Sequence, residues 1–421
     1  MKKIIFSILT ISLFAASALA TNPVITAMPS LTISPDGRSA AMGDVGVATS
    51  ADLNSQHWNP AKYAFMESQG GLTVNYTPWL RKLVNDIDLA YIAGYYNMGD
   101  MAGTLSASFR YFSMGTVQLV NYAGEAYQEA HPNEWAIDLA YSRKLHEYVS
   151  MAVALRFLYS DLTNGANTDV NSATDMYPGM TAAADVALFY RQPIALPTGE
   201  SYFRLGFNLS NLGGKITHDD HATENFIPAN MRIGVSYEIP FDNFNRLTAT
   251  VECNKMLVPT YKSRFAPEEN NFVYSPSDDK YKEISPVEGW WQSFCDAPGY
   301  YYSVGDNGKR DYYYTTEKLD NPDLKYVSPA LEELQEVQLG IGLEYSYNRQ
   351  FFGRVGYTHE NHCKGNRQYV TLGAGFHLSI FSLDFAYCIA TAASNPLDQT
   401  MRFTLGFDLA GIKDLVNNVK K

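Results

Sequence analysis

Two short segments combine histidine with carboxylate or amide side chains, which are residue types that bind divalent metals. One runs from His218 to His221 (HDDH) and the other from His359 to His362 (HENH). Imidazole nitrogens and carboxylate oxygens are common ligands of zinc and related ions. Neither spacing matches a helical pair of metal ligands, and both segments fall in predicted loops. We interpret them as polar loop tips, and we predict no metal site and no cofactor.

A serine hydrolase would need a serine, a histidine and a carboxylate that converge. Ser106, His377 and Asp384 are candidates, because their strand positions direct all three toward one interior. The chain has no Gly-x-Ser-x-Gly elbow, no CxxC pair and no phosphate-binding glycine loop. Polar side chains are also common inside any large barrel, so we predict no catalytic residues and a protein that is not an enzyme.

The elements that carry these side chains are predicted to be β-strands. From residue 70 onward apolar and polar residues alternate, as in 401–409, MRFTLGFDL, where the odd-numbered positions are apolar. Successive side chains of a strand point to opposite faces, so this period of two indicates a strand with one apolar and one polar face. The pattern predicts fourteen strands: 70–80, 87–98, 103–114, 134–145, 149–162, 179–194, 201–212, 230–240, 245–257, 336–348, 351–360, 368–379, 381–390 and 400–410.

The connections between these strands alternate in length. Short turns such as 348–350 alternate with long links, of which the longest is 258–335. An even number of strands with short periplasmic turns and long extracellular loops is typical of outer-membrane barrels. The predicted fold is therefore all-β, a 14-stranded antiparallel transmembrane β-barrel over residues 70–410, followed by a short C-terminal tail at 411–421.

The first twenty residues, MKKIIFSILTISLFAASALA, predict a secretory signal peptide. Lys2 and Lys3 precede an apolar run, and Ala18-Leu19-Ala20 is a small-x-small cleavage site. The chain contains 30 tyrosines and carries a formal net charge of -12, which disfavours a nucleic-acid partner. Export together with a tyrosine-rich strand pattern predicts localisation in the outer membrane, in contact with its lipid and lipopolysaccharide.

The barrel's two faces can be assigned from the alternation. The apolar face must contact lipid, because hydrocarbon solvates no charge. The opposite face then lines the lumen, and it carries these charged residues: Arg110, Asp138, Arg156, Asp185, Arg204, Arg232, Glu344 and Arg402. Fourteen strands enclose more space than wall side chains fill. We expect residues 21–69, a small-residue-rich segment at the periplasmic end of the first strand, to act as a plug with which these charges pair.

The four cysteines fall into two groups by predicted position. Cys253 is placed on the lipid face and Cys388 on the lumen face, so they are not expected to pair. Cys295 and Cys363 both lie in loops on the long-loop side. A disulfide between them is possible, provided that their Cα atoms come within about 7 Å.

The segment ending in Trp58-Asn59-Pro60-Ala61, just before a fourteen-stranded barrel, resembles the FadL family of outer-membrane proteins. That resemblance implies an N-terminal hatch in the lumen, with this motif as its turn into the first strand. It also implies that His57, beside Trp58, is structural rather than catalytic.

Within that family the chain most resembles the barrel proteins of the type IX secretion system of Bacteroidetes. The matching segments are LTISPDGRSAAMGDVGVATSADLNSQHWNPAKYAF (31–65), YTPWLRKLVNDI (76–87), FRYFSMG (109–115), NKMLVP (254–259), SFCDAPGY (293–300), GYTHE (356–360) and RQYVTLGAGF (367–376). The resemblance implies that the protein binds secreted cargo with a C-terminal signal domain. It would take this cargo from the translocon barrel to a surface attachment complex that includes a sortase-like protease.

Two alternatives stay open at this point, namely FadL-like uptake of hydrophobic small molecules and lipopolysaccharide O-deacylation, which the same family resemblance implies. If the protein binds cargo, aromatic residues in the longest loop are the candidate contacts, because aromatic side chains dominate binding energy at protein interfaces. They are Trp290, Trp291, Phe294, Tyr300, Tyr301 and Tyr302.

Overall fold

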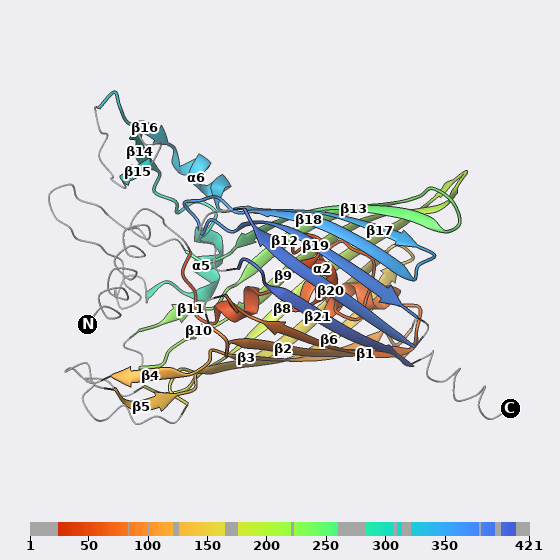
Figure 1. The fold of residues 1–421 in the computed structure, drawn as a ribbon, viewed down its shortest axis with the longest axis horizontal. Coiled ribbons are helices and arrows are strands. Elements are labelled where there is room, and N and C mark those ends of the chain that lie inside the picture. Colours follow the sequence, from red (N-terminus) through yellow and green to blue (C-terminus); the bar gives the residue numbers. More distant parts are fainter. Residues whose placement is uncertain are drawn as a thin grey trace.

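A computed structural model describes residues 24–82, 84–99, 101–120, 126–164, 176–219, 223–259, 283–305, 310–313, 321–378, 380–391 and 397–409. The predicted signal peptide and the C-terminal tail lie outside these residues. Within them, fourteen strands close into one antiparallel barrel (Figure 1). These are β1 (Gly70–Pro78), β2 (Asp88–Asn97), β3 (Thr104–Ser113), β6 (Asn133–His146), β7 (Val149–Asp161), β8 (Gly179–Leu196), β9 (Gly199–Gly213), β12 (Asn230–Pro240), β13 (Asn245–Met256), β17 (Gln338–Tyr347), β18 (Phe351–His359), β19 (Gln368–His377), β20 (Phe381–Ala390) and β21 (Met401–Asp408).

The barrel closes by pairing of its first and last strands, from Gly71 opposite Asp408 to Tyr76 opposite Phe403. Every other barrel strand pairs with its neighbours in chain order, so the predicted fold class is confirmed. The alternation in the sequence located each strand because lipid tolerates only the apolar face. None of the described helices is long and apolar enough to cross a membrane.

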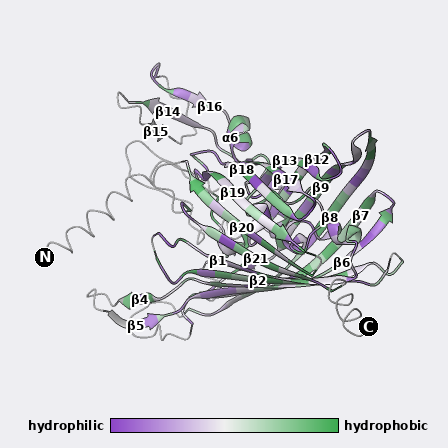
Figure 2. Cartoon of the chain, turned by 45° about the vertical axis from the view of Figure 1, so that its right-hand side comes forward, coloured by the Kyte–Doolittle hydropathy of each residue, from purple (hydrophilic) through white to green (hydrophobic). Residues whose placement is uncertain are grey.

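The two faces of each strand differ as the alternation predicts. Along β3, Leu105 and Phe109 are exposed on the outer face, whereas Arg110 points into the lumen and is 4% exposed. Figure 2 shows the same change of hydropathy from residue to residue along the strands. We take the end with short turns as periplasmic and the end with long loops as extracellular.

The long loops contain further elements that the alternation did not predict. Two hairpins form from β4 (Val117–Val120) with β5 (Ala126–Ala130) and from β10 (Lys215–Ile216) with β11 (Asn225–Phe226). The longest loop contains the helices α5 (Pro286–Gln292) and α6 (Pro329–Gln335) and the strands β14 (Tyr300–Val304), β15 (Arg310–Tyr313) and β16 (Lys325–Val327). These elements are too short for a period to be recognised in the sequence.

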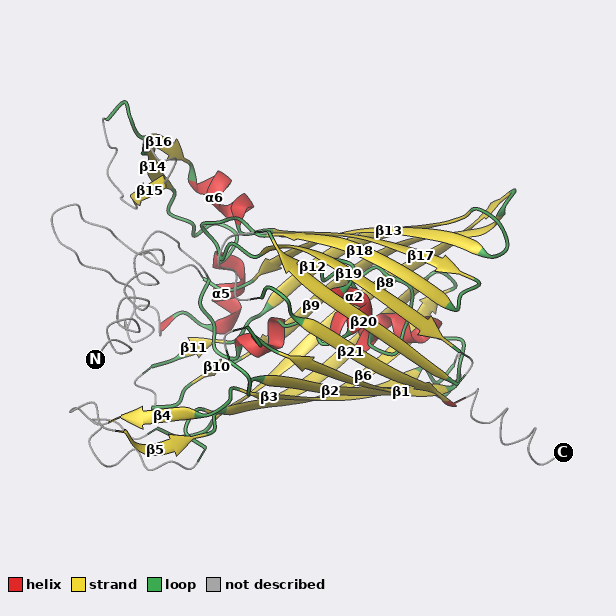
Figure 3. Cartoon of the chain, viewed as in Figure 1, coloured by secondary structure: helices red, strands yellow, loops and turns green. Residues whose placement is uncertain are grey.

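Residues 24–69, called here the N-terminal segment, lie inside the barrel (Figure 3). The segment forms four short helices, η1 (Pro29–Thr32), α2 (Gly37–Ala40), α3 (Ser55–Trp58) and η2 (Pro60–Phe65). Asp36 caps α2, where its side chain accepts a hydrogen bond from the Ser39 amide. Prolines begin η1 and η2, where the fixed φ angle of proline suits the first helical position.

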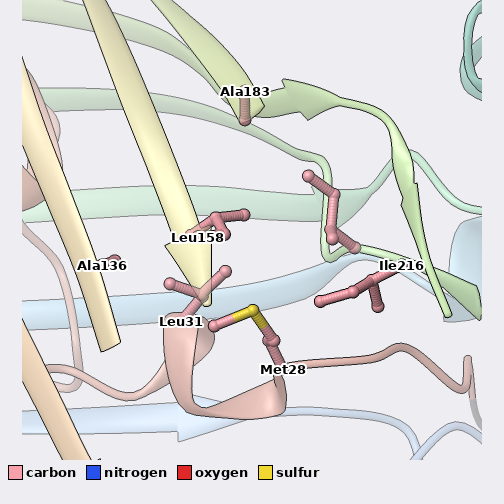
Figure 4. Packing of buried hydrophobic residues seen from close by; sticks show 7 residues of the cluster. Met28, Leu31, Ala136, Leu158, Ala183 and Ile216 are labelled. Atoms are coloured by element: carbon pink, nitrogen blue, oxygen red, sulfur yellow. The ribbon is translucent and has the colours of Figure 1, made fainter. Parts of the chain in front are cut away.

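The course of this segment differs from our expectation. We placed it at the periplasmic end of the first strand, but the Ala27 amide donates to the Phe226 carbonyl near the extracellular mouth. Met28 and Leu31 then pack against Leu158 and Ile216 in an apolar cluster at that end (Figure 4). The chain passes through the lumen from there and reaches the periplasmic end only at β1.

Glycines on the lumen face allow the backbone of the segment to lie directly on the barrel wall. A Cβ added to Gly356 would lie 2.0 Å from the Met42 carbonyl carbon, and one on Gly206 would lie 2.0 Å from the Val47 oxygen. Side chains cannot fit at such distances, so only glycine permits this approach. Gly342 on β17 permits the same approach, because a Cβ there would lie 2.6 Å from the Met42 carbonyl oxygen.

Candidate functional site

A buried ionic network joins the N-terminal segment to the barrel wall. The guanidinium of Arg38 donates to both carboxylate oxygens of Glu344, at 3.0 and 2.8 Å, and to Asp52 at 2.8 Å. Arg354 donates to Glu344 at 2.7 Å and to Asp384 at 2.6 Å. These charges are sequestered from water, and each is compensated by an opposite charge, as buried ions require.

The Trp58-Asn59-Pro60-Ala61 motif fastens the segment to the opposite part of the wall. The Asn59 amide donates to the carbonyls of Val47 and of Leu188 on β8, each at 3.0 Å. Its own side-chain oxygen accepts from the Ala61 amide and so caps η2. The Asn208 amide on β9 donates to the Trp58 carbonyl at 2.9 Å. The motif therefore binds the N-terminal segment to β8 and β9 through hydrogen bonds.

His57 is part of the same packing. Its Nδ1 accepts a hydrogen bond from Arg110 at 3.0 Å, and its carbonyl accepts one from Arg232 at 3.4 Å. The guanidinium of Arg232 also stacks 4.8 Å from the Trp58 ring centroid. Arg110 in addition donates to the carbonyls of Ser30 and Ile33. These two wall arginines hold the backbone of the segment.

The other lumen charges named from the sequence pair within the wall or with the segment. Arg156 donates to Asp138 and, at 3.0 Å, to Asp185. Arg204 forms an ion pair with Glu238, and Arg402 donates to the Ser34 carbonyl at 3.1 Å. All eight predicted lumen charges are buried. Their partners are wall carboxylates as well as groups of the N-terminal segment.

A cavity between the N-terminal segment and β12, β13 and β17 has a volume of about 40 Å³. Asp44, Arg232, Glu252 and Asn254 are among the polar residues that line it. A buried water needs roughly 10–15 Å³ on this measure, so the cavity has room for a few waters. A cavity that is known to bind benzene is several times larger, about 150 Å³.

The structure separates the residues considered for chemistry. His377 lies 3.2 Å from Asp384, but the Ser106 hydroxyl donates to Gln56 of the N-terminal segment instead. His218 contacts Ser160, while Asp220 and His221 lie outside the described residues. Among the described residues, no group of three or more His, Cys, Asp or Glu side chains is arranged to hold a metal ion.

At the extracellular end, α6 and residues 283–299, which include α5 and precede β14, form what we call the cap. Ion pairs attach the cap to the barrel. Lys364, in the β18–β19 loop, donates to Glu332 at 2.7 Å and to Glu336 at 3.0 Å. Lys255 at the end of β13 donates to Glu336 at 2.6 Å. Glu332 also accepts from the Gly299 amide at 2.7 Å. Two barrel lysines thereby fix α6, and α6 fixes the start of β14.

The six aromatic residues proposed as cargo contacts differ in exposure: those on and just after α5 are exposed or half-buried, and those of β14 are buried or half-buried. Trp291 is 73% exposed and Phe294 is 43% exposed, and Trp290 is half-buried. Tyr300 is 2% exposed because it packs against Val327 and Cys363, and Tyr301 is also buried. Tyr302 is half-buried beside Tyr300. The buried tyrosines hold the cap together, so only the α5 side of this group is available to a partner.

The possible disulfide between Cys295 and Cys363 is not formed in the structure. Cys295 is exposed, whereas the buried Cys363 thiol lies 3.5 Å from the Tyr300 hydroxyl. As expected from the strand faces, Cys253 is exposed on the outer wall and Cys388 is buried.

A closed antiparallel barrel with an apolar outer face, a charged lumen and its own chain packed inside defines an outer-membrane β-barrel protein with a plugged lumen. Residues 17–263 match the family described as "Type IX secretion system protein PorV". The chain belongs to this family, and its place is the outer membrane.

Several solved outer-membrane structures are similar to this chain at low identity. The CymD monoaromatic hydrocarbon channel is 11% identical, with 89% of this chain and 98% of that chain covered and a TM-score of 0.45. The Pseudomonas putida toluene transporter TodX is 10% identical, with 87% and 95% covered and a TM-score of 0.44. A Pseudomonas aeruginosa FadL homologue is 10% identical, with 92% and 100% covered and a TM-score of 0.39. No curated protein matches the chain.

The cap should loosen in acid. Burial raises the pKa of Glu336, but Lys364 and Lys255 lower that pKa by more, so it lies below its ordinary value. Its stabilising contribution is therefore present above the ordinary value of about 4.3 and is lost as pH falls through the lowered one. Burial lowers the pKa of Lys364, but Glu336 and Glu332 raise it by more, so the lysine contribution is fully present below the ordinary pKa of about 10.4 and is lost as pH rises through the raised one.

We expect backbone amide exchange of α6, corrected for intrinsic rates, to be constant between pH 5 and 9 and to increase at pH 3. Lys364→Met should raise exchange already at pH 7, because it leaves the buried Glu332 without its lysine and Glu336 with Lys255 alone. Exchange of α6 that is the same at pH 3 and pH 7 in the wild-type protein would contradict this account of the cap.

Sequence reasoning missed the buried charges of the N-terminal segment, namely Arg38, which pairs with Glu344 on the wall, and Asp52 and Lys62, which bond within the segment. Lys62 is 0% exposed and donates to the Gly46 carbonyl at 2.9 Å and to Thr49 at 3.0 Å. A signal was present, because these are isolated charges in a segment otherwise rich in small and apolar residues. The exposed leucines of α6 were also missed.

Proposed function

We propose that the extracellular cap binds secreted cargo with a C-terminal signal domain, as a non-enzymatic step of type IX secretion. The protein would take this cargo from the translocon barrel and pass it to the attachment complex with its sortase-like protease. Membership of the type IX family supports the pathway. The support for a binding role of the cap is its own surface.

That surface carries large apolar side chains that no packing within the cap requires. On α5 and just after it, Val287, Trp291 and Phe294 are 54%, 73% and 43% exposed. On α6, Leu331 and Leu334 are 46% and 66% exposed, on a helix that barrel lysines hold in place. Exposed apolar residues gathered on a fixed element in water are typical of interaction sites. The exposed apolar side chains of α5 and of the fixed helix α6 are the observation on which the proposal depends.

The combined variant Trp291→Ala, Phe294→Ala and Leu334→Ala tests the proposal. Loss of interface hot spots typically costs 2 kcal/mol or more, so cargo recovered with the protein should fall about thirtyfold. The measurement is a mild-detergent pull-down from native membranes, with quantification of secreted proteins that share a C-terminal domain. Tyr177→Ala, which truncates an aromatic side chain 54% exposed in the β7–β8 loop, is the matched control. Unchanged cargo recovery with a folded triple variant would refute the role of the cap.

The two alternatives find less support in the described residues. Uptake of hydrophobic molecules would need an apolar route through the lumen, yet the cavity beside the N-terminal segment is polar and small. O-deacylation would need a nucleophile, but the Ser106 hydroxyl donates a hydrogen bond to Gln56, and His377 contacts Asp384 instead. We therefore propose the N-terminal segment as a hatch that closes the lumen, and not as part of an active site.

A further inference from the structure

The lipid-facing wall contains an apolar groove of about 1090 Å³ that is separate from the lumen and from the cap. It extends across β1, β2, β3, β6 and β7, near the periplasmic ends of these strands. Its lining is almost entirely apolar, and it is a depression in a surface that already faces hydrocarbon.

Strand register explains the groove. One row of outward residues runs across five strands as Leu72, Gly94, Ala107, Leu139 and Leu155. Its centre is low, because Gly94 has no side chain and Ala107 has only a methyl group. The rows on either side carry Tyr96 and Leu105 toward the periplasm and Ile92 and Phe109 toward the exterior. The β2–β3 pairing continues without a break through Gly94 and Ala107, so the groove is a dent and not an opening.

An arginine lies just beyond the periplasmic edge of this groove, on the side where the lipid headgroups are expected. Leu139, Tyr141 and Arg143 follow one another on the outward face of β6, all exposed. Arg143 is four residues from Leu139, roughly 13 Å along the strand and, at the usual strand tilt, about 10 Å nearer the periplasm along the bilayer normal. Tyr141 has the place of an interfacial aromatic residue. Arg143 forms no hydrogen bond or ion pair with any described residue.

We propose that the groove holds an acyl chain of a glycerophospholipid from the periplasmic leaflet, with the lipid phosphate bound to Arg143. The dent offers an acyl chain contacts on several sides that a flat barrel wall does not offer. A guanidinium binds phosphate with paired, charge-assisted hydrogen bonds. The position of Arg143 at the periplasmic end selects the phospholipid leaflet over the leaflet that carries lipopolysaccharide.

Native mass spectrometry of the full chain in mild detergent, with added palmitoyl-oleoyl phosphatidylethanolamine, tests this proposal. The wild-type protein should retain one phospholipid at collision energies that strip lipid from the rest of the wall. Ala107→Trp fills the dent, and Arg143→Gln removes the charge. Each should lower the retained phospholipid about tenfold, as expected for the loss of one well-packed chain or one charged hydrogen bond.

Two further variants are matched controls for these substitutions. Ala249→Trp adds the same volume at an exposed, outward position of β13 outside the groove, opposite Leu343 and Tyr237. Arg349→Gln removes an exposed arginine from the periplasmic turn after β17. Both should retain lipid as the wild-type protein does. Equal retention in the groove variants and their controls would overturn the proposal, and so would retention of lipid A in place of phospholipid. Heat-modified gel mobility identifies any variant that fails to fold, and Gly94→Ala is then the milder substitution to compare.

Discussion

Replacement of Gly356 by alanine should displace the N-terminal segment and so open a channel through the barrel. The added Cβ would lie 2.0 Å from the Met42 carbonyl carbon and 2.1 Å from the Gly43 nitrogen. Both are backbone atoms, so no side-chain rotation relieves the clash. Overpacking of this kind costs about 3 kcal/mol, which raises the population with a displaced N-terminal segment on the order of a hundredfold. Gly206→Ala, directed at the Val47 oxygen from β9, should have a similar effect.

Single-channel conductance in planar bilayers measures this displacement directly. Wild-type protein should stay closed for most of the recording, and Gly356→Ala should show frequent large openings. Gly353→Ala is the control, because it adds the same methyl group to the same strand on the outer face, with nothing within 4 Å. If Gly356→Ala folds and remains as closed as Gly353→Ala, the close contact of residues 42–47 with the wall does not keep the lumen shut.

The barrel itself could be read from the sequence because the membrane constrains every strand in the same way. Lipid rejects charge at each outward position, so Leu105, Phe109 and their equivalents recur at a period of two whatever else the protein does. Water imposes no such period on the extracellular loops. The cap depends on particular contacts, such as Lys364 with Glu332, that leave no regular pattern in the chain.

The interior site could be predicted only in part. Alternation shows that Arg354 and Glu344 point inward, but not that Arg38, 306 residues before Glu344, shares the Glu344 carboxylate with Arg354. The same limit applies to the groove. Gly94 and Ala107 are ordinary small residues until the β2–β3 register places them side by side. Contacts set by register and by a folded insert need the three-dimensional structure.

The Arg38 network also connects stability to closure of the barrel. Arg38 is the residue of the N-terminal segment that contacts Glu344 on β17 and Asp52 at once. Removal of one partner from a buried ion pair costs about 3–5 kcal/mol, because the remaining charge stays buried without compensation. Surface pairs behave differently, since water already solvates both charges and their net contribution is about 0–1 kcal/mol.

Arg38→Met should therefore lower the free energy of unfolding by about 3 kcal/mol or more, measured by urea titration of the folded barrel in detergent. Arg81→Met, which removes a similarly close pair with Asp88 whose side chains are 35% and 34% exposed, should change it by less than about 1 kcal/mol. Adding Glu344→Gln to Arg38→Met should recover part of the loss, because Arg354 alone then no longer has to compensate both Glu344 and Asp384. Equal effects of Arg38→Met and Arg81→Met, or strictly additive effects of the two network substitutions, would mean that this ion pair does not hold the N-terminal segment in the lumen.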